Sequence, residues 1–273
     1  MPELPELEVL RRQAASELVD RTIESVTVNQ PKAINTSRPE YEDRVEGRSI
    51  ESVERKGKYL ALHLDSDDSL LVHFSMGGAL VLKDSAEHEP AHTPFVFAFE
   101  DGEFMHAVRW QLGSIKVYDT DYLHQPNGPL GQLGPDAWDD VDDAERLQKI
   151  LTGSGAGIKP RLMNQEIICG IGNAYSDEII FEARLHPKTN TSSLEDDDFA
   201  EIYDAIRGVF GRAIEAGGDG FMDLHGNEGT AHEDFAVHNR EGEDCPNGCG
   251  GEVETIKVSG RTGYYCPKCQ KKR

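Results

Sequence analysis

The 273-residue sequence has no long apolar run and few basic residues. No stretch approaches the roughly 20 apolar residues that cross a bilayer. The N-terminus also lacks the basic region and the apolar stretch of a signal peptide. These absences predict a cytoplasmic protein without a membrane partner. Lys and Arg total 28 against 50 Asp and Glu, for a formal net charge of −22, so charge alone argues against a nucleic-acid partner.

The distribution of charge changes that conclusion. Acidic residues are concentrated in runs such as 136–145 and 195–198, which are typical of a solvated surface. After Glu254 there is no acidic residue, and the charged side chains are all basic: Lys257, Arg261, Lys268, Lys271, Lys272 and Arg273. The C-terminal segment is therefore a cationic end on an acidic chain. The overall excess of acid resembles the solvated shell of halophilic proteins.

Cysteine is scarce, and four of the five cysteines lie close to the C-terminus. Three residues separate Cys245 from Cys249, two separate Cys266 from Cys269, and sixteen residues that can form a hairpin join the pairs. This spacing can bring four thiolates to one tetrahedral centre, as a structural zinc ion requires. Disulfide pairing is the alternative, but a reducing compartment favours metal. Cys169 lies in an apolar run and is interpreted as a small buried hydrophobic residue.

Hydrophobic periodicity divides the chain into a β-rich part and a helical part. Residues 6–19 carry apolar side chains at helical spacing, and short apolar runs separated by Gly, Asp and Ser follow from 22 to 118. Such runs are typical of an antiparallel sandwich or barrel. A Pro- and Gly-rich stretch at 126–135 indicates a linker. Helical patterns follow it at 143–151, 161–168, 173–181 and 197–216.

The N-terminus, Met-Pro-Glu-Leu-Pro-Glu, holds a potential secondary amine beside two carboxylates. Removal of Met1, which a residue as small as Pro2 permits, would leave an amine with a pKa of about 7.7–8.0. Its neutral fraction can attack an electrophilic sugar carbon, and the resulting iminium acts as an electron sink. Glu3 and Glu6 are near enough to protonate a leaving oxygen and stabilise the developing cation. A frayed terminus without function is the alternative.

Two further segments could contact phosphate. A basic turn at residues 54–60 carries Lys58, and its alternative interpretation is an ordinary solvated turn. Residues 159–165 and a helix that starts near Asn173 flank the glycine-rich turn Gly170-Ile-Gly172. Backbone N–H groups at the start of a helix can clamp phosphate, although tight helix packing explains the glycines equally well.

Taken in order, these features resemble the formamidopyrimidine-DNA glycosylase / endonuclease VIII family. The resemblance covers essentially the whole chain and is strongest in residues 2–8, 159–187 and 245–270. It implies an α+β, multidomain protein: an N-terminal antiparallel β-sandwich with a leading helix, a helical helix-two-turn-helix domain and a C-terminal zinc-finger hairpin. The predicted domains are 1–125 for the catalytic sandwich, 126–136 for the linker, 137–235 for the helix-two-turn-helix domain and 236–273 for the four-cysteine finger.

The resemblance also implies roles for individual residues. Pro2 would be the Schiff-base nucleophile, Glu3 the proton donor and Glu6 a support of the sugar site. Lys58 would contact the phosphate beside the lesion and assist elimination, and Arg261 would lie near the reacting phosphate. Met76 would be a wedge, Lys159 and Asn173 would clamp phosphates, and Tyr175 and Glu178 would support the site. The other implied DNA-binding residues are His92 and Arg109.

Two segments depart from the purine-repair branch of the family. That branch commonly has Arg-Arg-Phe-Gly as a second wedge, whereas residues 109–113 read Arg-Trp-Gln-Leu-Gly, so either Trp110 or Leu112 could insert. The loop at 218–225 also differs from the lesion-capping loops of that branch. The preferred lesion, an oxidised purine or pyrimidine, and the opposite base therefore stay open.

The implied function is a bifunctional DNA glycosylase and AP lyase that excises oxidised bases, through a Schiff base on Pro2 followed by β- or δ-elimination. Its partner would be double-stranded DNA with oxidised bases or abasic sites, bound by a monomer at the nucleoid. One structural zinc ion is the expected cofactor, and four cysteine ligands leave no open position for metal catalysis. The alternatives are a catalytically inactive nucleic-acid-binding protein on the same scaffold and an acidic zinc-ribbon adaptor that binds protein.

Overall fold

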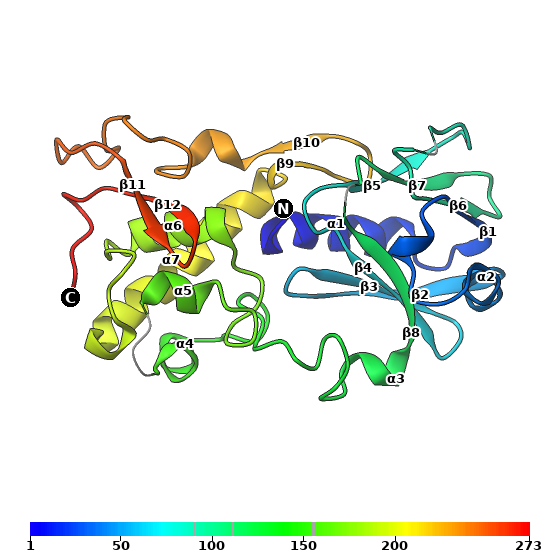
Figure 1. Ribbon diagram of the computed structural model, residues 1–273, viewed down its shortest axis with the longest axis horizontal. Helices are drawn as coiled ribbons and strands as arrows, with labels where there is room; N and C mark the ends of the chain where they lie inside the picture. The colour runs from blue at the N-terminus through cyan, green and yellow to red at the C-terminus, as the bar shows by residue number, and fades with distance from the viewer. Residues whose placement is uncertain (90, 111, 154–156) are drawn as a thin grey trace. The chain divides into compact units, whose positions relative to one another are not determined.

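The computed structural model describes residues 1–89, 91–110, 112–153 and 157–273 and shows an α+β chain (Figure 1). The chain divides into two compact units. Unit 1 contains Met1–Gln132 and Ile214–Thr230, and unit 2 contains Leu133–Ala213 and Ala231–Arg273. Among the helices of the described ranges, none is long and apolar enough to cross a membrane.

Unit 1 consists of a leading helix and an eight-stranded antiparallel sheet. Helix α1 spans Leu4–Glu17. The strands are β1 (Thr22–Val28), β2 (Arg48–Lys56), β3 (Tyr59–Leu64), β4 (Asp68–His73), β5 (Ala79–Lys83), β6 (Phe95–Phe99), β7 (Phe104–Val108) and β8 (Ser114–Asp119). Their order in the sheet is β5-β7-β6-β1-β2-β3-β4-β8.

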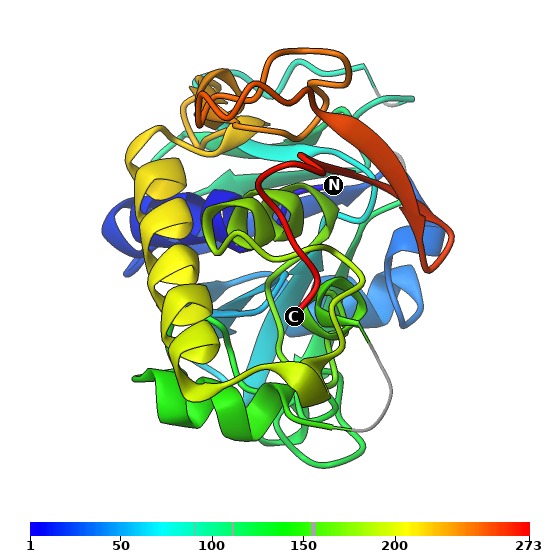
Figure 2. The same cartoon turned by 90° about the vertical axis from the view of Figure 1, so that its left-hand side faces the viewer.

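Strand β2 joins two halves of this sheet. Its start pairs with β1 at Ser49 and Arg48, whereas the residues from Ile50 to Lys56 pair with β3. The register shifts between Ile50 and Ser52, an irregularity of the kind that bends a strand. One apolar core takes side chains from both halves and from α1, and both views show α1 running between the halves (Figures 1 and 2). The predicted sandwich therefore forms from one continuous sheet.

The start of α1 follows from local sequence. Leu7, Leu10 and Ala14 recur at helical spacing and are buried in the core. Glu3 is the N-cap and forms a capping box with Glu6, which satisfies backbone N–H groups that have no partner inside the helix. Short elements complete unit 1: η1 (Pro31–Ala33), α2 (Arg38–Val45), α3 (Thr120–Leu123), β9 (Asp219–Met222) and β10 (Glu228–Thr230).

Unit 2 consists of helices followed by a hairpin. Its elements are α4 (Ala144–Leu151), α5 (Ile158–Leu162), α6 (Asn173–Glu182), η2 (Thr191–Ser193), α7 (Asp196–Glu215, which ends in unit 1), η3 (Ala231–Asp234), β11 (Glu254–Val258) and β12 (Arg261–Tyr265). Val258 pairs with Arg261, so Ser259 and Gly260 form a two-residue turn. Both have positive φ, as a type I′ hairpin turn requires.

The helix predicted at 161–168 was wrong in its position, since α5 spans Ile158–Leu162. Side chains after α5 bind the backbone and compete with a helical continuation. Asn164 Oδ1 accepts the N–H of Glu166 at 3.0 Å, and Gln165 Oε1 accepts the N–H of Gly170 at 2.9 Å. These bonds shape the turn between α5 and α6 instead of a longer helix.

Candidate functional site

The N-terminal carboxylates are buried and held in fixed positions. Pro2 is buried, and Glu3 and Glu6 are 5% and 2% exposed. Glu6 Oε2 accepts the N–H of Glu3 at 2.7 Å, and Oε1 accepts the N–H of Asp219 at 2.9 Å. A Cβ at Gly218 would lie 2.7 Å from Glu6 Cγ, so the loop approaches this closely because the residue is glycine. Glu6 therefore connects the start of α1 to the loop before β9.

Lys58 occupies the turn between β2 and β3. Gly57 and Lys58 separate the paired residues Lys56 and Tyr59, and Gly57 has a φ of 57°. A glycine with positive φ at the first central position is typical of a type II′ turn. Burial, and then the charges of Lys58 and Lys116, lower the pKa of His73 on β4. Lys58 therefore contributes positive charge to a site where His73 is neutral at physiological pH.

Two exposed apolar side chains lie in loops of unit 1. Met76 is 66% exposed after β4, and Leu112 is 69% exposed before β8. Trp110 is only 4% exposed and packs on Phe74, with ring centroids 5.0 Å apart. Gln111, between the two candidate wedges, lies outside the described residues. Trp110 is therefore a core residue, whereas Leu112 and Met76 are accessible.

The two other predicted DNA-contact residues of unit 1 are exposed and form surface ion pairs. His92 Nδ1 lies 3.1 Å from Glu89 Oε2. Arg109 donates to Glu228 Oε1 at 2.8 Å, and its own φ is 52°. Such exposed pairs contribute only ~0–1 kcal/mol, so a phosphate could replace either carboxylate at little cost.

The structure places Lys159 differently from the prediction of a phosphate clamp. Its side chain is completely buried, and Nζ donates to Asp177 Oδ1 at 2.6 Å, Ser176 Oγ at 2.9 Å and the carbonyl oxygen of Asn173 at 3.1 Å. The ammonium therefore has no surface that a phosphate could contact. In this conformation Lys159 holds the N-terminal part of α6 through an ion pair with Asp177 and hydrogen bonds to Asn173 and Ser176.

Asn173 and Arg261 lie on neighbouring elements of unit 2. Asn173 begins α6, and its side-chain N–H donates to the carbonyl oxygen of Thr262 on β12 at 3.0 Å. Arg261, the residue before Thr262, is exposed. A Cβ at Gly263 would lie 3.1 Å from Asp177 Oδ1, so glycine allows β12 to approach α6 closely. The hairpin that carries Arg261 is thus fixed against the start of α6.

Tyr175 and Glu178, the two predicted supports of the site, are both buried. Tyr175 packs edge-on between Phe210 and Phe235, with ring centroids 5.7 and 5.5 Å away. Burial raises the pKa of Glu178, although the backbone N–H groups of residues 236–238 donate to its carboxylate and oppose that shift. These bonds hold the segment that leads from η3 towards the finger.

The four C-terminal cysteines fit one zinc ion. Their Sγ atoms all lie within 4.8 Å of one another, with Cys245 and Cys269 at 3.5 Å and Cys249 and Cys266 at 3.6 Å. A tetrahedral site with Zn–S bonds of about 2.3 Å requires S–S separations of about 3.8 Å. No disulfide joins these cysteines, all of which are described. The sulfurs therefore form a closed four-thiolate zinc site.

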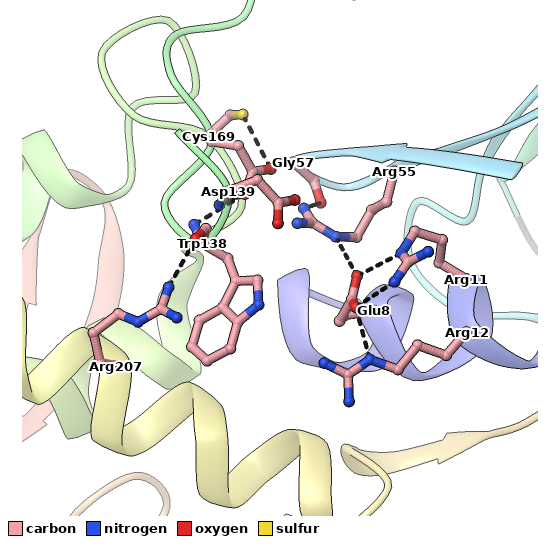
Figure 3. A network of polar contacts seen from close by, with 10 residues as sticks. Glu8, Arg11, Arg12, Arg55, Gly57, Trp138, Asp139, Cys169 and Arg207 are labelled. Carbon is pink, nitrogen blue, oxygen red and sulfur yellow. Dashed lines mark hydrogen bonds and ion pairs between the residues drawn. The ribbon is translucent and has the colours of Figure 1, made fainter. Parts of the chain in front are cut away.

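One charged cluster around the buried Glu8 was missed from the sequence. Glu8 on α1 pairs with Arg11 and Arg12 on the same helix and with Arg55 on β2 (Figure 3). The spacing of Glu8, Arg11 and Arg12 is a helical i, i+3, i+4 signal that could have been recognised. Arg55 lies 47 residues further along the chain, so no local signal predicts its contact.

Three family models match successive segments of the chain. They are the formamidopyrimidine-DNA glycosylase N-terminal domain over residues 1–109, the formamidopyrimidine-DNA glycosylase H2TH domain over residues 133–224, and the zinc finger found in FPG and IleRS over residues 242–272. A four-thiolate finger after a helical module and an N-terminal sheet is thus the arrangement of a zinc-finger DNA glycosylase.

Individual relatives match the whole chain. The formamidopyrimidine-DNA glycosylase of Heliobacterium modesticaldum is 37% identical over 281 residues, which cover 99% of this chain and 100% of the relative. The structure of Lactococcus lactis Fpg (MutM) with N7-benzyl-Fapy-dG DNA matches with a TM-score of 0.89 at 30% identity, and its complex with abasic-site DNA with 0.88 at 29%. Each covers 99% of this chain and 100% of the other. The chain belongs to the formamidopyrimidine-DNA glycosylase family, which confirms the predicted family, fold class and zinc finger.

Proposed function

We propose that this chain is a bifunctional DNA glycosylase and AP lyase that excises oxidised bases from double-stranded DNA. The observation that carries the proposal is the buried Glu3 and Glu6 pair beside Pro2, in a chain of this family. The names of its relatives and their complexes with lesion-containing and abasic DNA support it. We further propose that it acts as a monomer on nucleoid DNA in the cytoplasm.

The N-terminal residues can perform the chemistry in two stages. The neutral amine of Pro2 attacks C1′, the C1′–base bond breaks, and the base leaves with the proton that the amine loses. Glu3 protonates the ring oxygen of the sugar, the C1′–O4′ bond breaks, and the ring-opened sugar is left as an iminium on Pro2. The iminium acidifies the C2′ hydrogens, and loss of one proton expels the 3′ phosphate. A second elimination releases the sugar.

A nicking assay on a duplex with one abasic site tests this function. The zinc-loaded protein should cut the strand, whereas Glu3→Gln, which keeps the shape of the side chain but not its acidity, should cut it far more slowly. A folded protein that binds the duplex without cutting it would instead be the inactive DNA-binding alternative. An adaptor for proteins would bind no DNA at any salt concentration.

Duplexes with 8-oxoguanine, formamidopyrimidine, 5-hydroxyuracil and thymine glycol would then identify the preferred lesion.

We propose Leu112, rather than Trp110, as the second wedge, with Met76 as the first. Leu112→Ala should slow excision of a paired lesion by about 10-fold, because turning a base out of the duplex costs a few kcal/mol that a wedge offsets. Cleavage of an abasic site, which has no base to unstack, should change much less. Trp110→Ala should instead lower the free energy of unfolding by about 3–5 kcal/mol. Equal excision rates for Leu112→Ala and the unchanged protein would rule out this role.

The excess of acidic residues predicts an unusual response to salt. Phosphate contacts release counterions, so a typical DNA-binding protein loses affinity as salt rises. This chain has 50 acidic residues and 28 basic ones. At low salt the protein should therefore repel DNA, and its acidic side chains should repel one another. In about 1 M KCl the Debye length is only about 3 Å, which screens that repulsion while close contacts from Lys58, Asn173 and Arg261 persist. We therefore propose an origin in a salt-rich cytoplasm.

Titration with KCl, followed by circular dichroism and by nicking of one lesion duplex, tests this proposal. Folding and activity should both increase from dilute buffer to roughly molar KCl. Full folding and maximal activity in dilute buffer would show that the acidic surface is no adaptation to salt.

A further inference from the structure

A buried ion pair connects α1 to the turn between β2 and β3. Arg55 Nε donates to Glu8 Oε2 at 3.2 Å, and the side chains of Arg55 and Glu8 are 0% and 4% exposed. Arg55 Nη1 also donates to the carbonyl oxygen of Gly57 at 3.3 Å. Gly57 immediately precedes Lys58. The guanidinium group of Arg55 therefore binds α1 through Nε and the turn that carries Lys58 through Nη1 (Figure 3).

Three arginines donate hydrogen bonds to the carboxylate of Glu8. Glu8 accepts hydrogen bonds from Arg11 at 2.8 and 2.9 Å and from Arg12 at 2.8 Å, so one carboxylate faces three guanidinium groups. Burial opposes ionisation of Glu8, but the hydrogen bonds from Arg11 and Arg12 prevail and lower its pKa to about 2. Glu8 is therefore fully ionised at any pH at which the protein would be assayed.

The three arginines would respond differently to loss of this carboxylate. The side chains of Arg11 and Arg12 are 32% and 54% exposed, so water can solvate them without Glu8. The side chain of Arg55 has no exposed surface, so water cannot take the place of the Glu8 carboxylate there, and loss of one charged member of a buried ion pair is strongly destabilising. Removal of the charge of Glu8 would therefore act mainly on Arg55, and through the carbonyl oxygen of Gly57 on the turn.

We propose that Glu8 and Arg55 are positioning residues that fix the Lys58 ammonium relative to the start of α1. This inference rests on the proposed function, in which Pro2 and Glu3 at that start react with the sugar while Lys58 contacts the adjacent phosphate. The type II′ turn has only two residues between strands, so a displacement of Gly57 is transmitted to Lys58. Arg55 would thus act on the reaction through the backbone.

The variant Glu8→Gln tests the proposal because it keeps the shape of the side chain and removes its charge. The single-turnover rate of strand cleavage at an abasic site should fall about 10- to 100-fold, the effect expected from misplacing a reacting group by about 1 Å. Affinity for the duplex should stay close to that of the unchanged protein. The matched control is Arg12→Gln, which removes another partner of Glu8 but none of the turn, and its cleavage rate should stay unchanged.

A double-mutant cycle separates positioning from general loss of structure. If Glu8 acts through Lys58, adding Glu8→Gln to Lys58→Ala should slow cleavage no further than Lys58→Ala alone. Multiplicative losses in the double variant would overturn the proposal. So would a Glu8→Gln protein that cleaves as fast as the unchanged protein.

A second variant keeps the test valid if Glu8→Gln does not fold. Glu8→Gln with Arg55→Met removes both charges of this pair together, so the variant does not bury the cation without the carboxylate of Glu8. This protein should fold, by circular dichroism, and still cleave slowly because nothing replaces the bond to Gly57; a normal rate would contradict the inference. If the unchanged zinc-loaded protein itself fails to cleave, the proposed function fails, and that result is distinct from a normal rate in either variant.

Discussion

Blocking the amine of Pro2 should abolish strand cleavage. A chain that retains Met1, or that carries an N-terminal extension, has an amide nitrogen at Pro2 with no lone pair available for attack. Because the amine is the proposed nucleophile, the cleavage rate at an abasic site should fall by about 1,000-fold or more. The measurement is a single-turnover nicking assay on protein whose N-terminus has been checked by mass spectrometry.

The control for this experiment is Pro2→Gly with Met1 removed. Glycine supplies a primary amine at the same position, so this variant should keep some cleavage while the blocked chain keeps none. Duplex affinity should be similar in both, because neither change removes a phosphate contact. Undiminished cleavage by a verified blocked chain would exclude Pro2 from the mechanism.

Replacing Cys266 by serine should release the zinc ion and unfold the finger. Cys266 is fully buried, and its Sγ lies within the four-sulfur cluster. Binding of a structural zinc ion contributes about 10–16 kcal/mol to the folding of an isolated finger, so a lost ligand should unfold the hairpin. Arg261 would then lose its position, and affinity for the lesion duplex should fall by about 10- to 100-fold. Metal analysis and a binding titration measure the two effects.

Arg261→Ala is the matched control for the finger. Arg261 lies on the same hairpin and is exposed. The variant should therefore keep one zinc ion per chain, whereas loss of the guanidinium group should weaken the late elimination step. Circular dichroism should show that the sheet of unit 1 persists in both variants. A Cys266→Ser protein with stoichiometric zinc, or with full DNA affinity, would contradict this role of the finger.

The fold was predictable where the signal is local. The spacing of the four cysteines predicts a hairpin, and the spacing of the apolar residues of α1 predicts a helix. Both patterns can be recognised from residues that are close together in the sequence. The continuity of the sheet was not predictable in the same way. It depends on β2 pairing with β1 at its start and with β3 beyond it, and no pattern in β2 itself specifies two different partners.

The site was predictable in its residue types but less so in their surroundings. Lys159 is in a motif that favours phosphate binding, yet its ammonium pairs with Asp177, 18 residues away, and is fully buried. Sequence alone could not choose between Trp110 and Leu112, because both are apolar and two positions apart. Exposure distinguishes them, and exposure is a property of the packed structure.

The most direct test of the central claim is reduction with borohydride during the reaction on an abasic duplex. An iminium between protein and sugar is reducible to a stable amine, whereas a purely hydrolytic glycosylase forms no such adduct. We expect a covalent protein–DNA adduct, and peptide mapping by mass spectrometry should assign it to the nitrogen of Pro2. Absence of any adduct in an actively cleaving sample, or an adduct on Lys58 instead, would contradict the account.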